Sequence, residues 1–315
     1  MKKILFSLML LCCAIAGKSQ SDVYTATLQH GDEVKVFYGT SALSQAVGAA
    51  EDGDAINLSA GNFSGVNITK AVSVYGAGFE EDEESGTGVT LITTGGLAVS
   101  CSDVHLEGIR VNGNINFNAV SNVSITKCYW NGSDLYNPAS VIEISKCVII
   151  GAINCRSQNI QGLRVLNSVI GAVRNVTIDS RVQVDHCMVY EDYGGALLYT
   201  NSLLVNGYVG SSAIAENSTV HNCVIISNIP ANRVVENCYV VPLAEIFADG
   251  ENYNYSPERT YELKQPEVWI GTDGTQCGLH GGDGWSKVPA TPVLKNMTVE
   301  VDGSTLKVNY ETQTR

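Results

Sequence analysis

The chain has 315 residues and a formal net charge of −13 at pH 7. An acidic surface of this kind argues against nucleic acid and anionic membrane as partners, whereas a neutral glycan or a cation remains compatible. Beyond the first 20 residues, no apolar stretch reaches the length of a membrane-spanning helix.

Residues 1–20 have the layout of a secretory signal peptide. Two lysines precede a short apolar run from Ile4 to Ala16, and small and polar residues follow it. Cleavage after Ala16 fits the Ala-x-Ala rule, and cleavage near Gln20 is the alternative. We therefore expect an exported protein, located in the periplasm, at the cell surface or outside the cell.

A short amphipathic helix is expected near residues 42–50, because apolar side chains recur there at helical spacing. Ser41 or Thr40 is placed to cap its first turn. A turn at Asp52–Asp54 and two strand-like segments, "AINLSAG" and "AVSVYGAG", come next. A stack of β-strands has an open end that exposes its core, and we expect this helix to cover it.

A repeat of roughly 20 residues occupies the middle of the chain. Apolar residues precede a small residue by three positions and mostly polar ones by two, which is typical of a strand with one buried face. The residue just before the small one is most often Asn, which tolerates the left-handed conformation and so predicts a one-residue bend. The small residues are Cys128, Cys147, Ser168, Cys187, Ser202, Cys223 and Cys238.

A strand, a bend, a second strand and a loop together describe one coil of a parallel β-helix, so we expect an all-β, single-domain body over residues 21–287. The small residue enters the interior directly after the bend, where a larger one would collide with its neighbours. Serine replaces cysteine at two of the seven positions, so packing of free thiols is favoured over disulfide pairing.

The strand after each bend is apolar on both faces, so its outer face needs a cover. The tail segment "NMTVEVDGSTLKVNYE" alternates apolar and polar residues around Asp302-Gly303 and is expected to form a β-hairpin. We predict that residues 288–315 pack on the helix body as this cover. A second subunit is the rival cover, and the monomer is favoured over the dimer.

Residues 38–78 resemble the entry of the pectin lyase-like superfamily, in the pattern "AL..AV.AA..GD.I.L..G.F" followed by "ITK.VSVYGAG". The segment "GTDGTQCGLHGG" is similar to the close of β-helix proteins found on bacterial cell surfaces. The resemblance implies a right-handed parallel β-helix with an N-terminal capping helix. It does not imply one activity, because this fold hosts lyases, hydrolases, epimerases and binding proteins.

Two aromatic segments are the candidate ligand site, because flat rings beside amide and carboxylate groups suit a sugar. They lie in "YWNGSDLYNP" and "VYEDYGG", at corresponding places three coils apart. The alternative is that the rings cover the core beneath their loops. The candidate residues are Trp130, Tyr136, Tyr190, Asp192 and Tyr193.

Charged groups give weaker signals. Glu143 and Arg164 should be neighbours in adjacent coils, either as part of a charged groove or, as favoured here, as an exposed ion pair. The acidic run Glu80–Glu84 lacks the alternation of a calcium loop and is expected to be a solvated loop. Catalytic residues stay unassigned, and no metal or cofactor is expected, since the five histidines are scattered.

The favoured function is recognition of carbohydrate, or adhesion, at the bacterial cell envelope without catalysis. One alternative is a divergent polysaccharide lyase or related enzyme with its site between Arg156 and Arg181. The hydrolase motifs of the superfamily are absent from the chain. Lyases of the superfamily have an Arg near a Pro, and no Pro lies near these arginines in the sequence. The other alternative is a structural component of the envelope.

Overall fold

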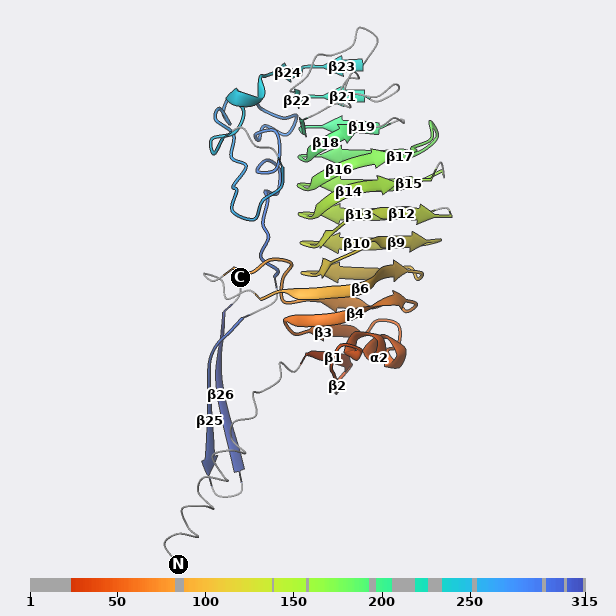
Figure 1. Ribbon diagram of the computed structural model, residues 1–315, viewed down its shortest axis with the longest axis vertical. Helices are drawn as coiled ribbons and strands as arrows, with labels where there is room; N and C mark the ends of the chain where they lie inside the picture. The colour runs from red at the N-terminus through yellow and green to blue at the C-terminus, as the bar shows by residue number, and fades with distance from the viewer. Residues whose placement is uncertain are drawn as a thin grey trace, which may run out of the picture.

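The computed structural model describes residues 24–82, 88–137, 139–156, 159–192, 197–205, 219–225, 234–250, 254–290, 293–302 and 305–313. The predicted signal peptide therefore lies outside the described residues. Two strand columns stack into a right-handed parallel β-solenoid of about 8 turns (Figure 1), which confirms the predicted fold class.

The first column, sheet 1, carries the strand that precedes each bend. Its strands run parallel from β3 onward, while β1 is antiparallel to both β2 and β3. In spatial order they are β2 (Glu33–Tyr38), β1 (Thr25–His30), β3 (Ala55–Leu58), β5 (Ser73–Tyr75), β7 (Val104–Glu107), β10 (Ser121–Thr126), β13 (Ser140–Ser145), β15 (Gln161–Leu166), β17 (Arg181–Asp185), β19 (Leu197–Thr200), β21 (Thr219–His221) and β23 (Val234–Glu236).

The second column, sheet 2, carries the strands that follow the bends, all parallel to their neighbours. They are β4 (Gly61–Ile68), β6 (Thr90–Val99), β8 (Arg110–Val111), β9 (Ile115–Asn118), β11 (Tyr129–Trp130), β12 (Ser133–Tyr136), β14 (Val148–Asn154), β16 (Val169–Arg174), β18 (Met188–Asp192), β20 (Leu203–Leu204), β22 (Val224–Ile225) and β24 (Tyr239–Val240).

The predicted one-residue bends are confirmed. All seven bend residues are left-handed, with φ between 43° and 56°, including the lysines and the histidine that favour this conformation less than Asn does. They are Lys127, Lys146, Asn167, His186, Asn201, Asn222 and Asn237.

The small residue after each bend does more than fit a tight space. Its side chain accepts a hydrogen bond from the backbone N–H of the small residue one turn earlier, at 3.4 Å for Cys128 to Cys147 and 3.0 Å for Cys147 to Ser168. The same bond recurs up to Cys223 and Cys238, at 3.3 Å. All eight cysteines in the described part of the chain are free, in agreement with the predicted reduced column.

The N-terminal end of the solenoid is closed by helix α2 (Ala42–Ala49), as predicted, and by the β1–β2 hairpin, which the sequence did not suggest. The helix buries one face, made of Ala42, Leu43, Ala46 and Val47. Ser41 holds the N-cap position, but its side chain does not cap the helix. Instead its hydroxyl accepts a hydrogen bond from Gln45 Nε2 at 2.7 Å.

The apolar outer face of sheet 2 has the cover that the sequence required. Residues 241–290, here called the strap, run along the solenoid and include the short helix η1 (Leu243–Glu245) (Figure 1). Strap side chains such as Phe247 and Trp269 pack on a stripe that they leave at most 2% exposed. The stripe consists of Val148, Val169, Met188, Leu203 and Val224.

The strap is held in part by the side chains of bend residues in the middle of the solenoid. Asn167 Nδ2 donates to the carbonyls of Leu279 and Gly281 at 2.9 and 2.7 Å. Asn201 Oδ1 accepts the Thr272 N–H at 2.7 Å, and Lys146 Nζ reaches the Asp283 carbonyl at 3.1 Å. Such a bend residue therefore has two roles: its backbone adopts the left-handed conformation, and its side chain binds the strap.

The C-terminal hairpin is confirmed as β25 (Val293–Asp302) paired with β26 (Thr305–Gln313). Its predicted packing on the helix body concerns side chains outside the described residues. The cover that the structure does describe is the strap, which precedes the hairpin in the chain.

Candidate functional site

Trp130 does not belong to a ligand site. Its side chain is 0% exposed, and its Nε1–H donates to Ser133 Oγ at 2.9 Å within the core. For this ring the structure supports the alternative interpretation, in which it belongs to the core: Trp130 is the second residue after Cys128, and in sheet 2 that position points inward along with Ile149 and Ile170.

Tyr136 is exposed, as the sequence interpretation requires, but one face of its ring is occupied by Arg156. The guanidinium carbon of Arg156 lies 4.7 Å from the ring centroid. The same guanidinium donates two hydrogen bonds of 2.8 Å to the Asp134 carboxylate, from Nε and from Nη2. The hydrogen bond from Arg156, together with a further one from Asn154, lowers the pKa of Asp134 even though burial raises it. Tyr136, Arg156, Asp134 and Asn154 thus form a surface cluster on sheet 2 whose polar groups bond to one another.

The second aromatic segment is only partly placed. Tyr190 is half-buried and packs against the strap, where it lines a 270 Å³ pocket with Arg174 and Glu191. Arg174 Nη2 and Glu191 Oε2 are 3.7 Å apart. Tyr193 and the side chain of Asp192 lie outside the described residues. Tyr136 on β12 and Tyr190 on β18 belong to turns that β14 and β16 separate, so they do not share one pocket.

Glu143 and Arg164 are neighbours, as predicted, on β13 and β15. Arg164 Nη1 lies 3.2 Å from Glu143 Oε2, and the two side chains are 52% and 45% exposed. A pair this exposed contributes about 0 to 1 kcal/mol to the free energy of unfolding, because water screens the two charges. Glu143 and Arg164 therefore form an exposed ion pair, which was the favoured interpretation of the sequence.

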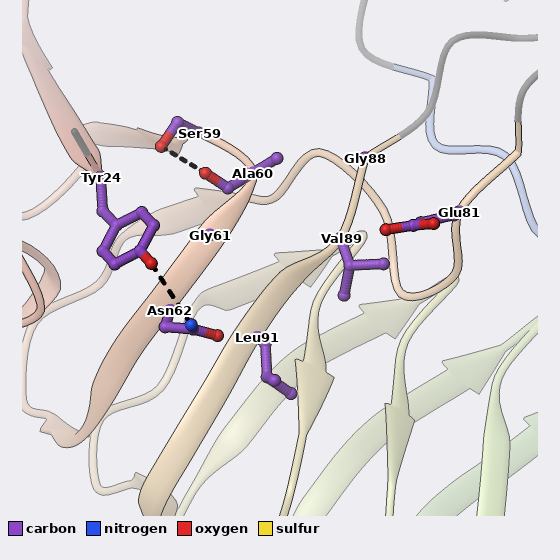
Figure 2. Close-up of a pocket in the computed structure, with 9 residues that line it drawn as sticks. All are labelled: Tyr24, Ser59, Ala60, Gly61, Asn62, Glu81, Gly88, Val89 and Leu91. Carbon is purple, nitrogen blue, oxygen red and sulfur yellow. Dashed lines mark hydrogen bonds between the residues drawn. The ribbon is translucent and has the colours of Figure 1, made fainter. Parts of the chain in front are cut away.

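A larger pocket, of 620 Å³, lies at the N-terminal end of sheet 2 and was not anticipated. Figure 2 shows the Tyr24 ring and the Asn62 amide on one side, Val89 and Leu91 in the middle, and Glu81 across from them. Asn62 Nδ2 lies 3.4 Å from the Tyr24 hydroxyl. The pocket thus combines a ring, two aliphatic side chains, an amide and a carboxylate.

The shape of this pocket follows from Gly61, the first residue of β4. Its φ is 133°, and a Cβ there would lie 2.0 Å from Tyr24 Cδ1, so only glycine lets the ring lie flat against the strand. Asn62 and Leu91 are register partners and point outward together, while Phe63 and Ile92 fill the core. The ring therefore stands beside an outward-facing polar and apolar pair.

Buried Thr90 fixes the loop that forms the other wall. Its hydroxyl donates to the Ser59 carbonyl and accepts the Ala77 N–H, both at 2.8 Å. Glu80, at the start of the acidic run, is 8% exposed: it accepts the Tyr255 hydroxyl and pairs with Lys287 Nζ at 2.9 Å. Glu80 is thus an anchor for the strap, and the expectation of a wholly solvated acidic loop is wrong at this residue.

The pocket lining offers polar and apolar groups side by side. Within the described ranges, no three His, Cys, Asp or Glu side chains are grouped to hold a metal ion. The lining supplies hydroxyl, amide and carboxylate groups together with apolar surface. A local sequence signal existed, because a glycine inside a strand pattern often marks close approach of another group.

Comparison with protein-family models, curated proteins and solved structures finds no match for this chain. None of the helices that the structure describes has both the length and the apolar character needed to cross a membrane. The fold itself defines the class, a parallel β-solenoid closed by an N-terminal helix and carrying an external strap.

Proposed function

We propose that the protein is an exported β-helix protein of the pectin lyase-like type, which recognises carbohydrate at the bacterial cell envelope without cleaving it. The observation that carries this proposal is the 620 Å³ pocket lined by Tyr24, Asn62, Glu81 and Leu91. The sequence supports export, through residues 1–20, and the superfamily, through residues 38–78.

A sugar ring presents C–H groups on its faces and hydroxyls around its edge. The C–H groups gain from contact with an aromatic or aliphatic surface, which Tyr24 and Leu91 provide. The hydroxyls require donors and acceptors, which the Asn62 amide and the Glu81 carboxylate provide. The pocket is open at the surface, so it suits one unit of a longer chain.

The lyase alternative placed a base between Arg156 and Arg181. The hydrogen bond that Arg156 donates to Asp134 raises the pKa of the guanidinium above its ordinary value, which disfavours loss of a proton. Arg164 is held in the exposed pair with Glu143. These contacts disfavour base catalysis at Arg156 and Arg164.

Glycan-array screening of the purified mature protein tests the proposal. Tyr24→Ala and Asn62→Ala should each weaken retention of the bound glycan about five- to tenfold, in line with the loss of roughly 1 kcal/mol or more per ring or hydrogen bond. Tyr136→Ala is the matched control, because that ring is exposed but covered on one face by Arg156. Equal loss in all three variants, or release of cleaved sugar, would contradict non-catalytic binding at this pocket.

A further inference from the structure

The charged groups described around the pocket opening are acidic. Among the lining residues that the structure describes, Glu81 alone carries a carboxylate or a basic group, and it is exposed. The residues on either side of it in the chain, Glu80 and Asp82, are acidic as well. Tyr24 and Asn62 add only neutral polar groups.

Two basic side chains that are linked to the pocket walls by a contact or by strand register have other partners. Lys287 pairs with Glu80, whose carboxylate is 8% exposed. Arg110 is the register partner of Leu91 on the next strand, but its guanidinium lies 4.4 Å from the centroid of the Tyr129 ring, on the side away from the pocket. The carboxylate of Glu81 therefore faces the pocket without a described cation in its lining.

A negative carboxylate at the mouth of a sugar pocket discriminates by charge. It attracts an ammonium group and repels a second carboxylate, and the total charge of −13 reinforces both effects at low salt. We propose that this pocket prefers an amino sugar with a free ammonium group over the corresponding N-acetylated sugar, and disfavours uronic acids. This inference rests on the proposed carbohydrate-binding function.

The test uses three trisaccharides with the mature protein at low salt: glucosamine, N-acetylglucosamine and galacturonic acid trimers. Calorimetric titration should give glucosamine binding about two- to fivefold tighter than N-acetylglucosamine binding, as expected for one exposed ion pair. Binding of the galacturonic acid trimer should be the weakest. The advantage of the glucosamine trimer should shrink as salt is raised.

Glu81→Gln should remove that advantage, because it weakens binding of the glucosamine trimer more than binding of the N-acetylglucosamine trimer, for which the amide oxygen of the new side chain still accepts a hydrogen bond. Glu143→Gln is the matched control, since it removes one exposed carboxylate from sheet 1, and it should change nothing. An equal loss in both variants would assign the preference to the overall charge and overturn the inference. Equal affinity for all three trimers overturns the inference but keeps the function, whereas binding of none overturns the inference and, together with no retention on the glycan array, contradicts the proposed function itself.

Discussion

The backbone N–H of Cys147 donates a 3.0 Å hydrogen bond to Ser168 Oγ, a side chain one full turn further along the solenoid. The left-handed bend interrupts the regular ladder between neighbouring strands, so this buried N–H needs another acceptor. The hydroxyl in turn donates to the Leu166 carbonyl at 2.7 Å. Cysteine and serine can replace each other in this column because both are small and both can accept and donate a hydrogen bond.

Ser168→Ala tests this explanation of the repeat. The change leaves the buried Cys147 N–H without its acceptor and should lower the free energy of unfolding by about 1 to 3 kcal/mol. Ser168→Cys keeps an acceptor of the kind found in neighbouring turns and should cost less than about 1 kcal/mol. Denaturant unfolding curves measure both. If the two variants were equally stable, packing alone would account for the column.

Thiol reactivity should separate Cys238 from the rest of its column. The hydrogen bond with the Cys223 side chain lowers the pKa of the Cys238 thiol to about 7, and this thiol is only half-buried. Burial raises the pKa of Cys128, in the same column, to about 12. Alkylation of the folded protein followed by peptide mapping should label Cys238 with a midpoint near pH 7. Labelling of Cys128 at a similar rate before unfolding would contradict the prediction.

The N-terminal closure should depend on pH through His30 and Asp54, whose Nδ1 and Oδ1 are 2.7 Å apart. That hydrogen bond raises the pKa of His30 above 6.5, so its contribution to stability is complete below 6.5 and disappears as pH rises through the raised value. Burial raises the pKa of Asp54, but hydrogen bonds from Glu51 N–H and His30 outweigh it and leave the pKa below 3.8, so this contribution disappears on acidification.

Melting temperatures of the wild type and His30→Gln should therefore differ most between about pH 4 and 6.5 and converge near pH 9. Asp32→Asn is a matched control that changes a nearby exposed charge. A difference that is constant from pH 4 to 9 would mean that the imidazole contributes through shape rather than charge.

Two truncations test the strap. A chain that ends after Val240 loses the cover over Val148, Val169 and Met188, and should bind more of a hydrophobic dye and self-associate. A chain that ends after Ala290 keeps the strap and should behave like the full-length protein in dye binding and sedimentation. A rise in dye binding in the longer chain would assign part of the cover to the hairpin.

Features that depend on near neighbours in the sequence were predictable. The bends at Lys127 and Asn167 follow from local conformational preference and a short period, and so do the buried small residues beside them. The coils and the capping helix follow from apolar spacing of the same kind.

Features that depend on distant partners were not predictable in this way. Tyr24 forms a pocket only because β1 pairs antiparallel to β3 and Gly61 leaves room for its ring. The strap contacts of Asn167 span 112 and 114 residues, and no local pattern signals them. Trp130 shows a different limit, because its inward direction depends on where the strand after the bend begins.

The position of the strap in the chain also sets an order of events in folding. Each solenoid turn can add to the preceding one through contacts about 15 to 21 residues apart, such as those of Cys187 and Ser202. The strap bonds instead close much longer loops, such as 71 residues for Asn201 with Thr272 and 137 residues for Lys146 with Asp283. Loop closure over such separations is slow, so the stripe stays in water until the last quarter of the chain arrives. The partly folded solenoid is consequently the state most prone to aggregate.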